Sequence, residues 1–259
     1  MRNDDGLMFH LHIKEGDIGR YVLMPGDPGR VAKIAAFLED AKAVAQNREY
    51  TTYTGSLLGE KVSVISTGIG CPSTAIAIEE SIEVGADTLI RVGTSGAMQP
   101  HIRTGDLAVV TGAIRDEGTS RAYLPIEFPA VADPEVVAAL SEGCQKLGYT
   151  HYTGISHSKD SFYGEVERKR MPMAESLEER WNAYVAGGAI CSEMESATLF
   201  ILASIYRKRA GAITSIINSA ELAEMDMGDK NKKMDTGDEN RVIKAAVEGL
   251  KILIQKDRK

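Results

Sequence analysis

Short apolar stretches of strand length alternate along this chain with segments whose apolar residues recur at helical spacing. The predicted strands are Tyr21–Pro25, Lys61–Ser66, the run that starts at Leu89, Asp106–Gly112, Tyr152–Ser158, Ala186–Ile190 and Ala212–Asn218. The predicted helices are 31–38, Ser73–Val84, Asp133–Leu147, Ala197–Tyr206 and 242–253. This order is typical of α/β proteins, which bind ligands in loops at the strand ends. Since 259 residues can form one large domain, we expect a single domain over residues 1–259.

Charge and composition exclude several functional classes. The chain has 30 Lys and Arg against 37 Asp and Glu, and this net charge of -7 argues against general nucleic-acid binding. It has no apolar run near the roughly 20 residues of a membrane helix, and its first residues lack the apolar core of a signal peptide. Cys71, Cys144 and Cys191 show no metal-ligand spacing, which fits a reducing compartment. We therefore expect a cytoplasmic protein that binds neither nucleic acid nor membrane.

The stretch Leu89–Met98 is the first candidate anion site. Here an apolar run interrupted by Arg91 is predicted to end in a turn that holds Gly93 and Gly96. Backbone N–H groups in a glycine turn can approach an oxyanion, and Thr94 and Arg91 can add donors. Such turns are also common joints without any ligand, so this motif alone leaves both interpretations open.

A second candidate lies at Pro25–Arg30, directly after the predicted strand Tyr21–Pro25. Asp27 is placed to cap the following helix, and Pro28 suits its first position. A glycine turn, a helix N-terminus and Arg30 together favour a phosphate site. The alternative is a well-capped helix whose arginine is solvated, and the residues by themselves do not decide between the two.

Two pairs of ring side chains also allow a structural and a functional interpretation. Residues 9–13 alternate apolar and imidazole side chains, which predicts a short extended segment with His10 and His12 on one face. The two histidines would form a polar edge or bind a metal ion. Phe162 and Tyr163, in a predicted loop, would fill the core or stack on a planar ligand.

Carboxylates follow the predicted strand Ala186–Ile190. Ser192 and Glu195 are three residues apart and match a capping box at the start of the next helix. Glu193 is left over, and carboxylates at a strand-to-helix turn can accept the hydroxyl donors of a sugar. Later in the chain, the polar residues 221–237 form either a lid over a site or a solvated connection.

Several of these segments, taken together, resemble the nucleoside phosphorylase-I family. The matching motifs are Pro25-Gly-Asp-Pro-Gly-Arg30, Asn47-Arg-Glu49, Ser66-Thr-Gly-Ile-Gly70, Arg91-Val-Gly-Thr-Ser-Gly96, Glu127-Phe-Pro-Ala-Val-Ala-Asp133 and Glu193-Met-Glu-Ser-Ala-Thr198. They cover nearly the whole chain in order, and they are most similar to the branch that cleaves uridine. The resemblance implies a three-layer α/β/α fold with a twisted mixed central sheet. It also implies a pentosyltransferase that uses inorganic phosphate to split uridine into uracil and ribose 1-phosphate.

The resemblance assigns roles to residues that match the family's motifs. It implies that phosphate is bound by Gly26, Arg30, Arg91, Thr94 and, from a neighbouring subunit, Arg48. It implies that ribose is bound by Glu193, Met194, Glu195 and, across a dimer contact, His10. It implies that the base is bound by Gly96, Phe162, Val166, Arg168 and Asn218. Catalysis would depend on positioning and electrostatics, without a covalent intermediate, and chiefly on Arg91, Arg168 and Glu195.

The same resemblance implies a homo-oligomer, as a hexamer built from three dimers that share active sites. No cofactor is required besides phosphate as co-substrate, and a potassium ion between subunits would be held by Glu49, Ile69 and Ser73. Because Arg91 would act on phosphate rather than in the core, we expect an Arg91→Ala variant to fold and to lose activity.

Two residues depart from the uridine-specific pattern. Val166 stands where a glutamine is typical, after Gly164-Glu165 rather than proline and glycine, and Ser219 stands where an arginine is typical. Valine cannot pair with a base edge, and an unpaired edge costs binding energy. The alternative substrate is therefore a purine nucleoside, with Asn218 as the hydrogen-bonding partner of its base.

Other classes of protein remain as alternatives. A nucleosidase that uses water would not need Arg30, Arg48 and Arg91 together. A nucleoside-binding protein without activity is compatible with the altered base pocket. Phosphate dependence and turnover distinguish these classes from a phosphorylase.

Overall fold

The computed structural model describes residues 1–218 and 239–259. Its strands are β1 (Tyr21–Met24), β2 (Glu39–Asn47), β3 (Tyr50–Leu57), β4 (Glu60–Ile65), β5 (Thr88–Ala97), β6 (Leu107–Asp116), β7 (Ala130–Val131), β8 (His151–Lys159), β9 (Cys191–Glu193) and β10 (Arg209–Asn218). Its α-helices are α1 (Pro28–Ala35), α2 (Cys71–Glu83), α3 (Pro134–Lys146), α4 (Phe162–Val166), α5 (Ala174–Ala186), α6 (Ser196–Tyr206) and α8 (Glu239–Asp257), with short 3₁₀ helices at Ser120–Ala122 and Arg168–Arg170. The expected lid or connection at 221–237 and the departure at Ser219 lie outside the described residues.

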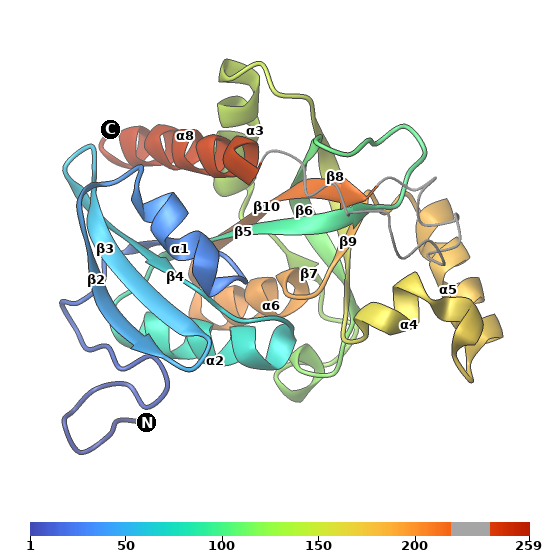
Figure 1. Cartoon of the computed structure of the whole chain (residues 1–259), viewed down its shortest axis with the longest axis horizontal. Coiled ribbons are helices and arrows are strands. Elements are labelled where there is room, and N and C mark those ends of the chain that lie inside the picture. Colours follow the sequence, from blue (N-terminus) through green and yellow to red (C-terminus); the bar gives the residue numbers. More distant parts are fainter. Residues whose placement is uncertain (219–238) are drawn as a thin grey trace.

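The strands form one mixed sheet in the order β10-β6-β8-β9-β5-β1-β4-β3-β2, with β7 beside β6. Because β10 pairs with both β5 and β6, the strands β5, β10, β6, β8 and β9 close into a ring (Figure 1). On the other edge of β5, β1 pairs as far as Arg91, and β9 pairs only from Gly96 onward. The sheet is therefore split beside the middle of β5, and such a split is where α/β folds bind ligands.

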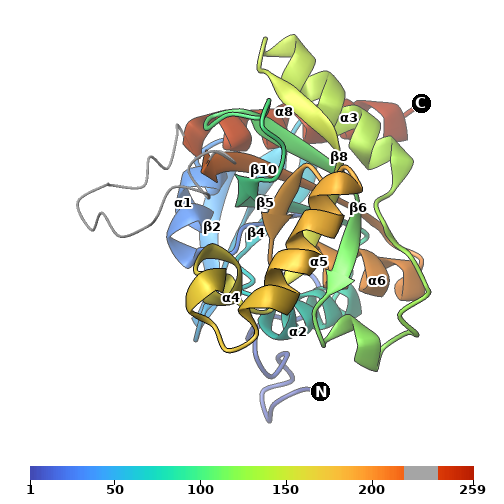
Figure 2. The same cartoon turned by 90° about the vertical axis from the view of Figure 1, so that its right-hand side faces the viewer.

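Helices cover both faces of this sheet, as the predicted three-layer arrangement requires. Figure 2 shows α3 and α8 above the strands and α2 and α6 below them. The alternation of β1 follows these layers, because Val22 and Met24 belong to the core on the α2 and α6 side, whereas Tyr21 and Leu23 belong to the core on the α1, α3 and α8 side. None of the helices within the described residues is long and apolar enough to cross a membrane.

The predicted helix starts after two of the strands are confirmed. Asp27 is the N-cap of α1 and accepts a hydrogen bond from the backbone N–H of Gly29. Asp133 caps α3 in the same way, through the backbone N–H groups of Glu135 and Val136. Both caps are followed by proline in the first turn, so short-range sequence sets these boundaries.

The glycine turn predicted at Gly93 and Gly96 is wrong, because both residues belong to β5. The strand continues as far as Ala97 because β10 pairs with it along residues 88–96 and β9 pairs with its end. These partners lie far along the chain, so the local glycines indicated a turn that tertiary pairing replaces by extended backbone.

Two further local predictions are wrong. Residues 9–13 are not extended but form a tight turn, in which Met8 donates to the carbonyl of Ile13 and His12 has a φ of 53°. Residues 186–190 are the end of α5 and the turn after it, and the strand is instead Cys191–Glu193. A short run of small residues does not distinguish these two structures.

The last helix is tied to the sheet by Asp257. Its carboxylate accepts hydrogen bonds from Arg209 at 2.8 and 2.5 Å and from the Tyr21 hydroxyl at 2.6 Å. The bonds from Arg209, and then that from Tyr21, hold the pKa of Asp257 at about 2 despite partial burial.

We expect an Asp257→Asn variant to lose about 1 to 3 kcal/mol of unfolding free energy at pH 7, because charge-assisted hydrogen bonds are lost. Because the pKa of Asp257 is lower in the folded protein than in the unfolded chain, this carboxylate stabilises the fold at pH values above its unfolded pKa of about 4. The contribution is lost as the pH falls toward about 2. Urea unfolding of both proteins at pH 7 and pH 3 measures the difference. A difference that is as large at pH 3 as at pH 7 would contradict this account.

Candidate active site

A cavity of about 650 Å³ opens at the split in the sheet, beside the middle of β5. Most of the predicted site residues line it, namely Gly26, Arg30, Glu49, Ile69, Ser73, Arg91, Thr94, Gly96, Phe162, Val166, Arg168, Met194, Glu195 and Asn218. The predicted residues His10, Arg48 and Glu193 do not. The fold thus gathers segments that are far apart in sequence around one chamber.

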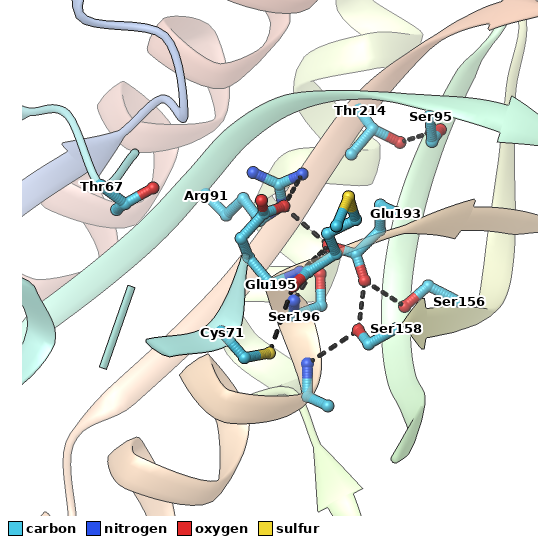
Figure 3. Close-up of polar contacts among 12 residues, drawn as sticks. Thr67, Cys71, Arg91, Ser95, Ser156, Ser158, Glu193, Glu195, Ser196 and Thr214 are labelled. Carbon is cyan, nitrogen blue, oxygen red and sulfur yellow. Dashed lines mark hydrogen bonds and ion pairs between the residues drawn. The ribbon is translucent and has the colours of Figure 1, made fainter. Parts of the chain in front are cut away.

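Arg91 lies on β5 at the floor of this cavity. Gly93 is on the same face of the strand, and a Cβ atom there would lie 2.7 Å from Cζ of Arg91, so only glycine leaves room for the guanidinium. Nε of Arg91 donates to Oε2 of Glu193 at 2.9 Å, and Nη2 lies 2.6 Å from Oε2 of Glu195 (Figure 3). No described residue pairs with Nη1, which is therefore the donor available to a ligand.

Glu193 lies beneath the cavity and is buried. Its Oε2 accepts hydrogen bonds from the backbone N–H groups of Glu195 and Ser196, each at 2.9 Å, so this side chain satisfies the start of α6. Its Oε1 accepts hydrogen bonds from Ser158 and, at 3.3 Å, from Ser156 (Figure 3). Burial opposes ionisation, but Arg91 and these hydrogen bonds lower the pKa of Glu193 below its ordinary value.

The capping box predicted for Ser192 and Glu195 is therefore not formed. Glu195 occupies the N-cap position of α6 without a side-chain capping bond, and Ser192 lies in β9. The carboxylate of Glu195 instead accepts the backbone N–H of Gly70 at 2.6 Å and faces the cavity. Burial raises the pKa of Glu195 against the attraction of Arg91, so the two neighbouring carboxylates differ in basicity.

Arg30 approaches the same cavity from the first turn of α1. It is buried, its Nη2 lies 3.6 Å from Oε1 of Glu239, and its Nε has no hydrogen-bond partner among the described residues. Arg30 also lines the cavity, and a nearly buried cation with so distant a carboxylate would be compensated by an anion there. This observation favours the phosphate interpretation of Pro25–Arg30 over a solvated arginine.

The opposite wall is formed by β9, the end of β8 and α4. Neither Phe162 nor Tyr163 fills the core, because they are 41% and 58% exposed, and Phe162 lines the cavity. Arg168 also lines it, with Nε donating to Glu178 at 2.8 Å and its guanidinium 4.5 Å above the ring of Trp181. The cavity thus has Arg30 on the α1 side and Phe162, Trp181 and the cationic Arg168 on the β9 side.

A sequence model described as "Phosphorylase superfamily" matches residues 20–253. The chain belongs to the phosphorylase superfamily. It is 46% identical over 249 residues to a uridine phosphorylase of Treponema pallidum. These aligned residues make up 96% of this chain and 95% of that relative. It is 47% identical over 221 residues to a uridine phosphorylase of Thermococcus kodakarensis, with coverages of 83% and 78%. It is also 41% identical over 207 residues to a guanosine phosphorylase of Halorubrum lacusprofundi, with coverages of 80% and 81%.

Sequence reasoning gave no site role to Lys159, Glu165, Trp181 and Ser192, which are among the side chains that line the cavity of this phosphorylase superfamily member. The sequence contained one signal that could have identified Lys159 and Glu165. Lys159 directly follows the predicted strand Tyr152–Ser158, and lysine is almost never buried without a partner. The acidic residue six positions later, Glu165, is that partner. Ser192 was missed because the sequence analysis had already assigned it to a capping box with Glu195.

His10 and Arg48 lie outside this chamber in the phosphorylase chain. Nδ1 of His10 is 2.7 Å from Oε1 of Glu80, and the same carboxylate accepts backbone N–H groups of His10 and Leu11. Arg48 is exposed at the turn between β2 and β3, with a φ of 54°. Both positions are accessible from outside the chain.

The three residues expected to hold potassium lie at one end of the cavity. The Ser73 hydroxyl donates to Oε1 of Glu49 at 2.8 Å, and the side chain of Ile69 is 76% exposed. The pKa of Glu49 is lowered by a hydrogen bond from the backbone of Glu49 itself and by one from Ser73. An ionised carboxylate beside a hydroxyl is a donor set that suits a hard cation.

Proposed function

We propose that this chain, acting as one domain over residues 1–259, is a pentosyltransferase that splits uridine with inorganic phosphate. The bond between the anomeric carbon and the base breaks, the base leaves with its electron pair, and a phosphate oxygen bonds to that carbon. The products are uracil and ribose 1-phosphate. The observation that carries the proposal is 46% identity to a uridine phosphorylase along nearly the full length of both chains. The geometry of the cavity supports it.

Phosphate would lie between α1 and β5, where Gly26, Arg30, Arg91 and Thr94 line the cavity. Arg30 and Arg91 both line this part of the cavity, and Nη1 of Arg91 has no hydrogen-bond partner among the described residues. Cations that are already positioned would hold the anion against the sugar carbon, which gains positive charge as the bond breaks. We propose no cofactor besides this co-substrate.

Ribose would lie over Met194 and Glu195, between the phosphate and the base. A carboxylate accepts two O–H donors well, and Glu195 is held by Gly70 so that it faces the cavity. Glu193 would act from beneath, by holding Arg91 and the start of α6. The base would meet Gly96, Phe162, Val166, Arg168 and Asn218, and Arg168 would stabilise the charge of the departing base.

The position of His10 and Arg48 outside the cavity supports a homo-oligomer in which each chain completes a neighbour's site. We propose a hexamer of three dimers, with potassium held between subunits by Glu49, Ile69 and Ser73. The ion would join two chains and takes no part in bond cleavage. Sedimentation of the active enzyme tests this arrangement, and a fully active monomer would contradict it.

All three cysteines are free and buried, which fits a reducing compartment. We propose that the protein acts in the cytoplasm. Cell fractionation tests this, and recovery of the protein outside the cytoplasmic fraction would contradict it.

The proposed function is tested by release of free base from uridine, thymidine, deoxyuridine, inosine, guanosine and adenosine, each with and without phosphate. We expect uridine to be cleaved only when phosphate is present. Guanosine is included because one relative is named for it. Preference for purines by orders of magnitude in kcat/KM would assign base recognition to Asn218, cleavage without phosphate would indicate a hydrolase, and binding without turnover would indicate a nucleoside-binding protein.

A further inference from the structure

Lys159 and Glu165 form an ion pair in the wall of the cavity, on the side proposed for the base. Nζ of Lys159 lies 2.9 Å from Oε2 of Glu165 and donates to the Ser192 hydroxyl at 2.8 Å. The same Oε2 accepts a hydrogen bond from Ser192 and lies 3.3 Å from Nδ1 of His157. Strand β8, strand β9 and helix α4 therefore meet at this pair.

Both members of the pair are nearly buried. The side chains of Lys159 and Glu165 are 8% and 12% exposed. Burial opposes ionisation of Glu165, but His157, Lys159 and Ser192 lower its pKa to about 2. A buried ion pair contributes little to stability compared with apolar side chains of the same size, so its position at a ligand cavity calls for a role in recognition.

The pair has one donor and one acceptor left over. An ammonium group carries three N–H donors, of which Lys159 directs two at Glu165 and Ser192. The contacts of Glu165 with Lys159, His157 and Ser192 all involve Oε2, and no described residue hydrogen-bonds to Oε1. A third N–H of Lys159 and Oε1 of Glu165 are therefore not engaged by the described residues, and both side chains line the cavity.

Neighbouring side chains cannot supply the same pattern. Val166 lines the cavity but has no polar side-chain atom. Arg168 has only donors, and two of its nitrogens are engaged by Glu178 and by the carbonyl of Glu165, each at 2.8 Å. Phe162 presents only a ring face or edge. An adjacent donor and acceptor on this wall come from Lys159 and Glu165.

We propose that Lys159 and Glu165 together recognise the edge of the base at which a ring N–H adjoins a carbonyl group. Glu165 accepts the ring N–H, and Lys159 donates to the neighbouring carbonyl oxygen. Uracil and thymine carry this edge, as do hypoxanthine and guanine. Cytosine and adenine present a ring acceptor beside an amino donor, which reverses the pattern. The inference rests on the proposed function, and it names which bases that site takes.

The test compares substrates that differ at this edge. We expect the wild-type enzyme to prefer uridine to 3-methyluridine and to cytidine by roughly 100-fold or more in kcat/KM. Lys159→Met should reduce the preference for uridine over cytidine roughly 10- to 100-fold, since it removes a charged hydrogen bond to the carbonyl. The double variant Lys159→Met/Glu165→Met leaves neither charge unpaired and should reduce both preferences. A role in packing alone would slow all substrates alike and leave these ratios unchanged.

Lys208→Met is the matched control, because it removes a lysine from an ion pair of 3.1 Å with Asp87 outside the cavity. It should leave the ratios and the KM for phosphate at wild-type values. Calorimetric binding of uracil and 3-methyluracil to the wild-type protein gives a readout that does not need turnover. Equal affinity for the two bases, or unchanged ratios in the double variant, would overturn this inference while uridine phosphorolysis stands. Discrimination between the bases without uridine turnover would instead support the inference and remove the proposed function.

Discussion

An Arg91→Ala variant is expected to lose about 1,000-fold in kcat/KM for uridine phosphorolysis. The side chain offers Nη1 to the cavity and is held in place by Glu193 and Glu195, so its removal takes away a positioned cation where phosphate would bind. Steady-state kinetics with varied phosphate measure the effect, which should appear in both kcat and the KM for phosphate.

Arg258→Ala is a suitable control, because it removes an exposed arginine that is paired with Glu60 and lines no part of the cavity. Its kinetic constants should stay near those of the wild type. An Arg91→Ala enzyme that keeps near-normal phosphorolysis would contradict the proposed phosphate site.

The expectation from sequence that Arg91→Ala folds normally needs revision. Arg91 is buried between two carboxylates, and removing one partner of such a group costs about 3 to 5 kcal/mol. Without the arginine, burial would raise the folded-state pKa of both carboxylates. The contribution of these two carboxylates to stability would then be greatest below their unfolded pKa of about 4.3 and would be lost as the pH rises. Arg91→Lys keeps a charge, so it separates the loss of phosphate geometry from the loss of stability.

Urea unfolding of the Arg91→Ala variant at pH 5 and pH 8 measures the stability effect. We expect the deficit relative to wild type to be smaller at pH 5. A deficit that is larger at pH 5 would show that the carboxylates do not carry the cost.

A Glu195→Gln variant is expected to lose roughly 100-fold in kcat/KM with uridine, because a carboxylate that accepts ribose hydroxyls becomes a neutral amide. The loss should be smaller with 2′-deoxyuridine, which lacks one of the hydroxyls. Measurement of kcat/KM for the wild type and the variant with both substrates gives a double-mutant-type cycle. The interaction energy from this cycle isolates the contact between Glu195 and the sugar hydroxyl.

Glu142→Gln serves as its control, since Glu142 is 42% exposed on α3 and lines no part of the cavity. It should leave both substrates unaffected. An equal loss with uridine and deoxyuridine in Glu195→Gln would assign Glu195 to holding Arg91 rather than ribose.

Local sequence determined several features of this protein by itself. Asp27 with Pro28 and Asp133 with Pro134 predicted two helix starts, because a capping bond spans only two or three residues. The ordered motifs predicted the family and the mixed α/β sheet. They also predicted most of the residues that line the cavity, since several motifs lie at strand ends, which gather in such folds.

Only the tertiary structure decided how these segments meet. β9 pairs with the far end of β5, so Glu193 reaches Arg91 and caps α6, a role that local spacing had assigned to Ser192. The pairing of β5 with β10 keeps Gly93 in a strand, and Ser192 of β9 contacts both Lys159 and Glu165. The physical reason is that a cap or a turn depends on neighbours a few residues away. The partner of a buried charge depends on strand order, which sequence spacing does not contain.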